Sequence, residues 1–138
     1  MKKWWTFVIL ILFIVNNIYA ENILTIEIHN IIINGGTIYM AIYFNDKSFK
    51  NKRPDITLQI MPNNINYLQE ITLSEGEYVI ALFQDINGNG EMDYGLFGIP
   101  KEPYGFSNMK GKTPGNYSQL KFRMNNSNEK ITIPLVRW

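Results

Sequence analysis

Residues 37–44 read T-I-Y-M-A-I-Y-F, and this stretch gives the clearest indication of the fold. Its aliphatic side chains Ile38, Met40 and Ile42 occupy every second position. Because successive side chains of a β-strand point to opposite faces, this spacing predicts a strand with one face buried in a core. The pair Gly35-Gly36 supplies a turn before the strand, and a charged loop over 45–54 follows it.

The same alternation recurs along the chain and predicts six further strands. These cover 24–29, 56–61, 65–73, 78–83, 119–124 and 131–136. The segment 78–83 is apolar at nearly every position, as expected of a central strand covered on both faces. Pro134 cannot donate to a ladder, so the last strand is predicted to lie at an edge or to have a bulge there. About seven strands without a convincing amphipathic helix predict an all-β, two-sheet sandwich, immunoglobulin-like or prealbumin-like, over 21–138.

The N-terminus has the pattern of a secretory signal peptide at 1–20. Lys2 and Lys3 precede a mostly apolar run from Trp4 to Val15, which is shorter than the roughly 20 residues that a membrane span needs. Ala20 is a small residue at the expected cleavage position. We therefore expect an exported protein, periplasmic, in the outer envelope or extracellular, without a stable membrane span after cleavage. An uncleaved N-terminal anchor is the alternative.

Composition excludes several classes of function. The chain of 138 residues has no cysteine, which excludes disulfides, cysteine-ligated zinc, thiol catalysis and lipoprotein acylation. The formal net charge is +1, and the sequence has no strongly basic face of the kind that binds nucleic acid. Residues 54–100 contain seven acids and no Lys, Arg or His, whereas residues 101–138 carry seven basic residues. The acidic middle favours a bound cation, although a solvated acidic face is the plainer interpretation.

The 32-residue segment 84–115 has no sustained periodicity, and such long irregular loops are typically functional or disordered. Within it, residues 85–93 read D-x-N-x-N-G-x-x-D, which matches a calcium loop at five positions. Calcium prefers six to eight oxygen ligands, and ligands at alternate positions reach a common centre as the chain wraps. The predicted ligands are Asp85, Asn87, Asn89, Glu91 through its backbone carbonyl, and Asp93.

This loop departs from an EF-hand at its twelfth position, where Leu96 replaces the bidentate Glu. Further ligands are therefore expected from elsewhere in the fold, and Glu102 and Asp46 are candidates. With so few charged ligands, we expect an affinity on the order of 0.1 to 1 mM. The alternative is that the two Asn-Gly pairs are turns, with Asp85 in an Asx-turn and no metal.

Several motifs together resemble the bacterial domain of unknown function 2141 family. They are the G-x-Y-x-[VI]-A strand from Gly76, the D-x-N-x-N-G-x-x-D loop, and G-I-P-K-E-P-Y-G-F-S-N at 98–108. The resemblance covers essentially the whole mature chain and implies an exported β-domain of unestablished biochemistry. The family usually has His before the loop Asp, where this chain has Gln84, and a G-P-P segment where this chain has Thr113-Pro114-Gly115.

The predicted function is a non-enzymatic envelope or surface module, stabilised by calcium, that binds an unknown protein or glycan. Four aromatic residues are candidates for partner binding: Tyr94, Phe97, Tyr104 and Phe106. Exposed rings favour glycan or protein binding, whereas rings packed beneath the loop form a second small core.

Two alternatives belong to other classes. A hydrolase acting on glycans could use loop acids such as Asp85, Asp93 and Glu102 as an acid and base pair. His29 is the only histidine, however, so Ser-His-Asp and His-rich zinc sites cannot be assembled, and we expect no enzymatic activity. The third class is an assembly subunit that pairs with a partner through an edge strand, for which the first strand is a candidate.

Overall fold

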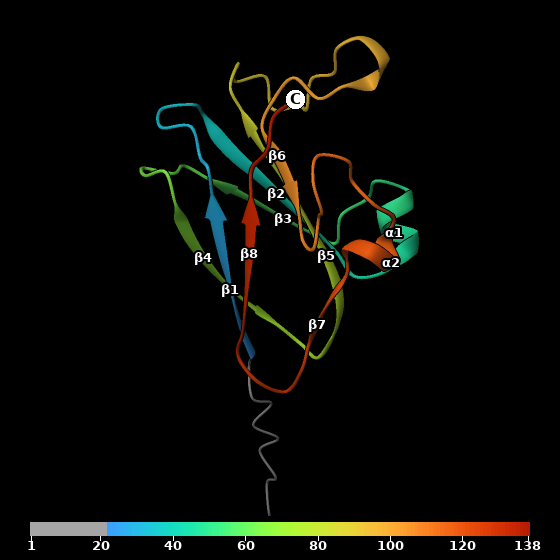
Figure 1. Cartoon of the computed structure of the whole chain (residues 1–138). Coiled ribbons are helices and arrows are strands. Elements are labelled where there is room, and N and C mark those ends of the chain that lie inside the picture. Colours follow the sequence, from blue (N-terminus) through green and yellow to red (C-terminus); the bar gives the residue numbers. More distant parts are fainter. Residues whose placement is uncertain (1–21) are drawn as a thin grey trace, which may run out of the picture.

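The computed structural model describes residues 22–138, which form two β-sheets packed face to face (Figure 1). Sheet A has the order β4-β1-β8. Its strands are β1 (Asn22–His29), β4 (Tyr67–Leu73) and β8 (Glu129–Pro134). Sheet B has the order β3-β2-β5-β6, with β7 also paired to β5. Its strands are β2 (Thr37–Tyr43), β3 (Ile56–Ile60), β5 (Gly76–Asp85), β6 (Tyr104–Phe106) and β7 (Phe122–Met124). The predicted all-β, two-sheet sandwich is confirmed.

The predicted signal peptide at 1–20 lies outside the described residues. Within 22–138, none of the helices has the length and apolar character needed to cross a membrane.

The core lies between the two sheets and is built from the alternating side chains that the sequence indicated. Its fully buried members include Leu24, Ile26, Ile28, Ile38, Met40, Ile42, Ile80 and Ile133. Each such side chain that folding removes from water contributes about 1.5–3 kcal/mol to the free energy of unfolding. Strand β5 is central, since it pairs with β2 on one side and with β6 and β7 on the other.

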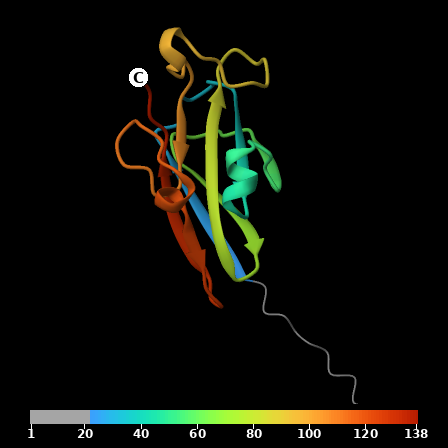
Figure 2. The same ribbon diagram turned by 90° about the vertical axis from the view of Figure 1, so that its right-hand side faces the viewer.

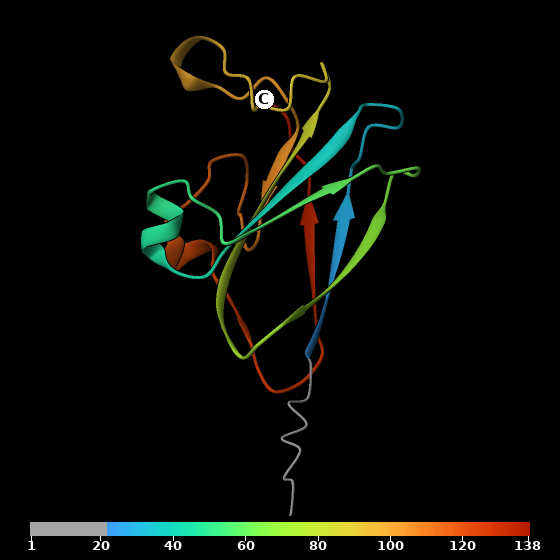
Figure 3. The same cartoon turned by 180° about the vertical axis from the view of Figure 1, so that it is seen from behind.

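A second, smaller cluster lies on the outer face of sheet B. Val79 of β5 packs there against Tyr117 and Leu120 of helix α2 (Tyr117–Leu120). Helix α1 (Asp46–Lys50) lies beside α2, as Figures 1 and 3 both show, and contributes Phe49 to the same cluster. The two short helices thus cover one part of this face and leave the rest to other segments.

Besides a short 3-10 helix, η1 (Leu96–Gly98), the structure adds three elements that the sequence interpretation did not contain. Each helix begins at an asparagine whose side chain accepts a backbone N–H, Asn45 from Ser48 in α1 and Asn116 from Gln119 in α2. The strand predicted over 119–124 was therefore too long, because α2 occupies its first part and only β7 remains. The third element is β6, which falls inside the segment predicted to be irregular.

Two predictions concerned which strands lie at the edges of the sheets. Strand β8 is an edge of sheet A, which confirms the prediction from Pro134. Strand β1 lies between β4 and β8, so the proposal that it pairs with a partner as an edge strand is wrong. Its backbone groups are occupied on both sides, antiparallel to β4 and parallel to β8. A parallel neighbour from the far end of the chain has no local signal in the sequence.

Candidate functional site

The segment between β5 and β6 lies at one end of the sandwich, beside the C-terminus (Figures 1 and 2). Its first part is the loop 85–93. Asp85 ends β5 and is only 2% exposed. Its carboxylate accepts the backbone N–H of Gly88 at 2.9 Å and that of Gly90 at 2.7 Å. Both glycines have positive φ, 76° and 79°, so the loop winds tightly around the carboxylate.

Three of the predicted ligand side chains meet within this loop. Asn87 and Asn89 donate their side-chain amide N–H groups to the same Asp93 carboxylate oxygen, at 2.5 and 3.0 Å. The side-chain oxygens of Asn87 and Asn89 accept the backbone N–H groups of Asn89 and Glu91, so a calcium ion between the three side chains would require both amides to turn and give up these hydrogen bonds. Glu91, predicted to contribute its carbonyl, donates its backbone N–H to the Asn89 side chain at 2.9 Å and exposes its own side chain.

Glu102 holds the two ends of the loop together. This residue is 4% exposed, and its two carboxylate oxygens accept the N–H of Ile86 at 3.0 Å and that of Asp93 at 3.3 Å. The backbone N–H of Lys101 also donates to the Asp93 carbonyl at 2.9 Å. Of the two candidates for extra ligands, Glu102 therefore contacts the loop, whereas Asp46 forms an ion pair with Lys50 in α1.

The loop and the residue that holds its ends together carry negative charge that no ion pair of the described residues neutralises. None of the ion pairs within residues 22–138 involves Asp85, Asp93 or Glu102. The same residues contain no cluster of three or more His, Cys, Asp or Glu side chains arranged to hold a metal. The side chains that converge at Asp93 include two amides, which present their N–H groups here and whose oxygens are hard ligands of the kind that calcium accepts. The donor chemistry fits calcium better than zinc or another transition metal.

Gln84, at the position where the family resemblance leads us to expect His, has a structural role here. Its side chain is fully buried and bridges β5 to the turn before β2. The side-chain oxygen accepts the N–H of Ile32 at 3.0 Å, and the side-chain nitrogen donates to the Ile32 carbonyl at 2.8 Å. The amide thus satisfies both backbone groups of one residue at the base of the loop.

All four predicted partner-binding aromatics line one groove on the outer face of sheet B, although they differ in exposure. Phe97 and Tyr94 are 98% and 58% exposed. Tyr104 is buried, donates its hydroxyl to the Lys112 carbonyl, and has a pKa that burial raises. Phe106 is partly buried and lies against Phe49, with ring centroids 6.4 Å apart. The exposed rings and the packed rings thus belong to the same surface.

This aromatic groove has a volume of about 1150 Å³. Its aromatic and large apolar lining includes Tyr39, Tyr43, Phe49, Phe83, Met92, Tyr94, Phe97, Ile99, Pro100, Tyr104, Phe106, Tyr117 and Trp138. Burial raises the pKa of Tyr43 and of Tyr117, so their hydroxyls stay neutral at ordinary pH. The contributions of Tyr39, Phe83 and Trp138 were not predicted. Aromatic residues at outward positions of the strands, where polar residues are usual, were the available signal.

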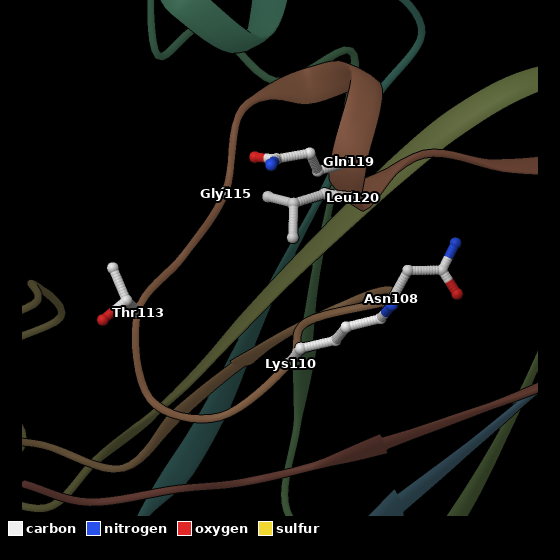
Figure 4. A pocket seen from close by; sticks show the side chains of 6 residues that line it. All are labelled: Asn108, Lys110, Thr113, Gly115, Gln119 and Leu120. Carbon is white, nitrogen blue, oxygen red and sulfur yellow. The ribbon is translucent and has the colours of Figure 1, made fainter.

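A second, smaller hollow of about 280 Å³ lies beside α2 (Figure 4). Two of its polar side chains form hydrogen bonds to the backbone around it. Asn108 donates to the Lys121 carbonyl at 2.7 Å, and Gln119 accepts the N–H of Asn116 at 3.0 Å. We therefore regard this hollow as structural.

His29 lies far from this chemistry in the fold. It alternates onto the outer face of sheet A, and its ring nitrogen is 3.2 Å from the Glu27 carboxylate. The groove occupies the outer face of sheet B, on the other side of the sandwich. The only histidine is thus separated by both sheets from the groove.

Comparison with known proteins gave a single family. The model of the family described as "Uncharacterized protein conserved in bacteria (DUF2141)" matches residues 26–132. No curated protein and no solved structure shows significant similarity to the chain.

Proposed function

Because the chain belongs to DUF2141, a family of uncharacterized proteins conserved in bacteria, we propose a function from the site itself. We propose an exported, non-enzymatic module that holds calcium in the loop 85–93 and binds a partner at the aromatic groove. The sequence of residues 1–20 supports export, since it has the charge, apolar run and cleavage position of a signal peptide.

One observation carries the calcium proposal: two buried carboxylates have no cationic partner. Asp85 and Glu102 are 2% and 4% exposed, and neither forms an ion pair within residues 22–138. Backbone N–H groups satisfy part of their hydrogen-bonding capacity, yet a buried negative charge without a counter-charge is costly. A calcium ion bound at the converging side chains of Asn87, Asn89 and Asp93 would offset that cost.

The loop and the groove are continuous along the chain. Met92 and Tyr94 line the groove, and Asp93 between them accepts the N–H of Lys101. Tyr94 also forms a bridge with Pro100, which lines the groove as well. Ordering of the loop by calcium would therefore fix one wall of the groove.

A non-enzymatic role is supported by the separation of the acid and base side chains from the groove. General acid-base chemistry needs groups placed where a substrate binds. The carboxylates of Asp85 and Glu102 accept backbone N–H groups within the loop, and His29 lies on the opposite face. The groove instead presents rings, which recognise ligands by contact area.

Thermal unfolding of residues 21–138 tests the calcium site. The protein is measured with EDTA and then with calcium or magnesium at about twenty times the expected dissociation constant. Such occupancy stabilises the fold by about 1.8 kcal/mol, which corresponds to a rise in Tm of several degrees. We expect the rise with calcium and a smaller one with magnesium, because magnesium dehydrates reluctantly and demands octahedral geometry.

The variant Asp93→Asn distinguishes a calcium site from a loop that consists of turns without metal. This variant removes one charge where the three side chains converge, and we expect it to lose most of the calcium-dependent rise. The matched control is Glu75→Gln, which removes an exposed charge in the turn between β4 and β5. Equal calcium responses in both variants, or no heat of calcium binding by calorimetry, would show that the loop consists of turns without metal.

Export is tested by expressing the full chain in a bacterium and measuring the mass of the protein in each fraction. We expect a product that begins at Glu21 in the periplasm, envelope or medium. A full-length product that stays with the cytoplasmic membrane would instead support the uncleaved anchor.

A further inference from the structure

The outer face of sheet B has a row of small side chains beside a row of rings. Ala41 of β2 and Ala81 of β5 are cross-strand partners, and both line the aromatic groove. Two residues along the strands, Tyr39 and Phe83 are also partners, and their rings stack with centroids 5.2 Å apart. Such rows are roughly 7 Å apart on one face of a sheet. The alanine row therefore forms a trough, about one side chain wide, that runs across the strands.

The other boundaries of this alanine trough are also apolar. On the side away from Tyr39, Tyr43 contacts the ring of Phe49 with centroids 5.2 Å apart. At one end, Phe106 is the partner of Ala81 on β6 and closes the row. At the other end, the partner of Ala41 is the exposed Thr57 on edge strand β3, so the trough is open there. A narrow apolar trough closed at one end suits a linear chain better than a broad, flat sugar ring.

The charge that remains uncompensated at this groove is positive. Asp46 is its only acidic lining residue among 22–138, and Lys50 neutralises it at 2.6 Å. Lys52 also lines the groove and takes part in none of the ion pairs of the described residues. Both lysines belong to the segment between β2 and β3, the edge strand at which the trough opens. The groove thus combines an apolar trough with the positive charge of Lys52, and this charge suits an anionic head group.

We propose that the aromatic groove binds the anion of a fatty acid, with its apolar chain along the alanine trough and its carboxylate toward Lys52. Apolar contact supplies the affinity, and the lysine selects the charge of the head group. The inference rests on the proposed binding role of the groove, and it does not depend on calcium in the loop 85–93.

Displacement of a fluorescent probe tests both parts of this inference. The probe is 8-anilinonaphthalene-1-sulfonate, which has aromatic rings and one negative charge, bound to residues 21–138. The competitors share a twelve-carbon chain and differ in head group: dodecanoate, dodecanol and dodecyltrimethylammonium, all below their micelle concentrations. We expect dodecanoate to displace the probe at a concentration at least three- to fivefold lower than the cationic competitor, as one exposed charge interaction allows.

Two substitutions locate the site. Ala41→Trp fills the trough from the outer face, and we expect it to weaken dodecanoate binding about tenfold or more. Its control, Thr25→Trp, adds the same side chain to the outer face of sheet A.

Lys52→Glu should weaken dodecanoate binding about three- to fivefold and reduce the preference for the anion. Its control, Lys47→Glu, reverses a charge in α1 that does not line the groove.

Circular dichroism confirms that each variant is folded before binding is compared. Equal displacement by the three head groups, or unchanged binding in Ala41→Trp, would overturn the proposal, as would no displacement by any of them. Each titration is run with EDTA and with calcium. Dodecanoate binding in EDTA would support the inference even if the loop proved to hold no calcium, and the two proposals are thereby separated.

Discussion

The outer faces of the two sheets differ in chemistry, although the same alternation of residues builds both. On sheet A, Glu27 lies at the centre of a polar network, 3.0 Å from Lys130 and 3.2 Å from His29. On sheet B, the corresponding outward positions carry the stacked pair Tyr39 and Phe83. The first face is suited to water, and the second to a ligand or a covering segment.

This difference leaves one outer face of the sandwich available for the binding role that we propose. The core between the sheets already contains most of the buried aliphatic side chains. The helices α1 and α2 cover only the part of sheet B around Val79, where the second cluster lies. Apolar surface beyond that cover marks a binding site more often than a defect of packing.

The largest expected effect comes from the point where the two sheets meet at β6. A Cβ atom added at Gly105 would lie 2.7 Å from the Pro134 carbonyl oxygen and 2.8 Å from a methyl carbon of Ile133. We expect Gly105→Val to destabilise the fold by about 3 kcal/mol, because β6 would be forced away from β8. Urea unfolding measures this, with Gly95→Ala as a control at a glycine that has room. Similar losses in the two variants would argue against a close approach of the sheets.

The next effect concerns the end of sheet B at which the loop 85–93 is fixed. Glu102→Ala would leave the N–H groups of Ile86 and Asp93 without their acceptor, and hydrogen bonds to a charged group contribute about 1.5–3 kcal/mol. We expect a loss of that size in EDTA. The control Glu91→Ala removes an exposed carboxylate of the same loop and should change stability by less than about 0.5 kcal/mol.

A smaller effect is expected for the interaction between the two stacked rings on the outer face of sheet B. A double-mutant cycle with Tyr39→Ala and Phe83→Ala should give a coupling of about 0.5–1.5 kcal/mol, as expected of a stacked aromatic pair. The coupling should change little with salt, because it is not ionic. A coupling near zero would mean that the two rings contribute to stability independently.

The smallest effect is expected on the outer face of sheet A and depends on pH. Hydrogen bonds from Lys130 and then from His29 lower the pKa of Glu27 below its usual value. Since the folded-state pKa is the lower one, the stabilisation is present above the unfolded-state pKa and is lost as the pH falls through the folded-state pKa. Glu27→Gln should therefore flatten the dependence of Tm on pH below about 4.5. Added salt should weaken this effect in the parent protein, in contrast to the coupling on sheet B.

Some of the site could be predicted from the sequence because its signal is local. The five ligand positions between Asp85 and Asp93 lie within one short loop, and the structure brings Asn87, Asn89 and Asp93 into contact. The clamp by Glu102 joins residues 16 positions apart, so spacing alone could only name it as a candidate. The start of α2 was missed although its signal is local, since Asn116 and Gln119 form a capping box.

The sequence by itself determined which side chains are buried, because alternation with period two is a property of each strand alone. Ile38, Met40 and Ile42 are at most 1% exposed for that reason. Only the tertiary structure decided that β1 is central and that β6 pairs with β5, because such pairings join residues far apart in the chain. It also decided which outward positions form a groove, since that depends on the segments that fold over each sheet and on those that leave it open.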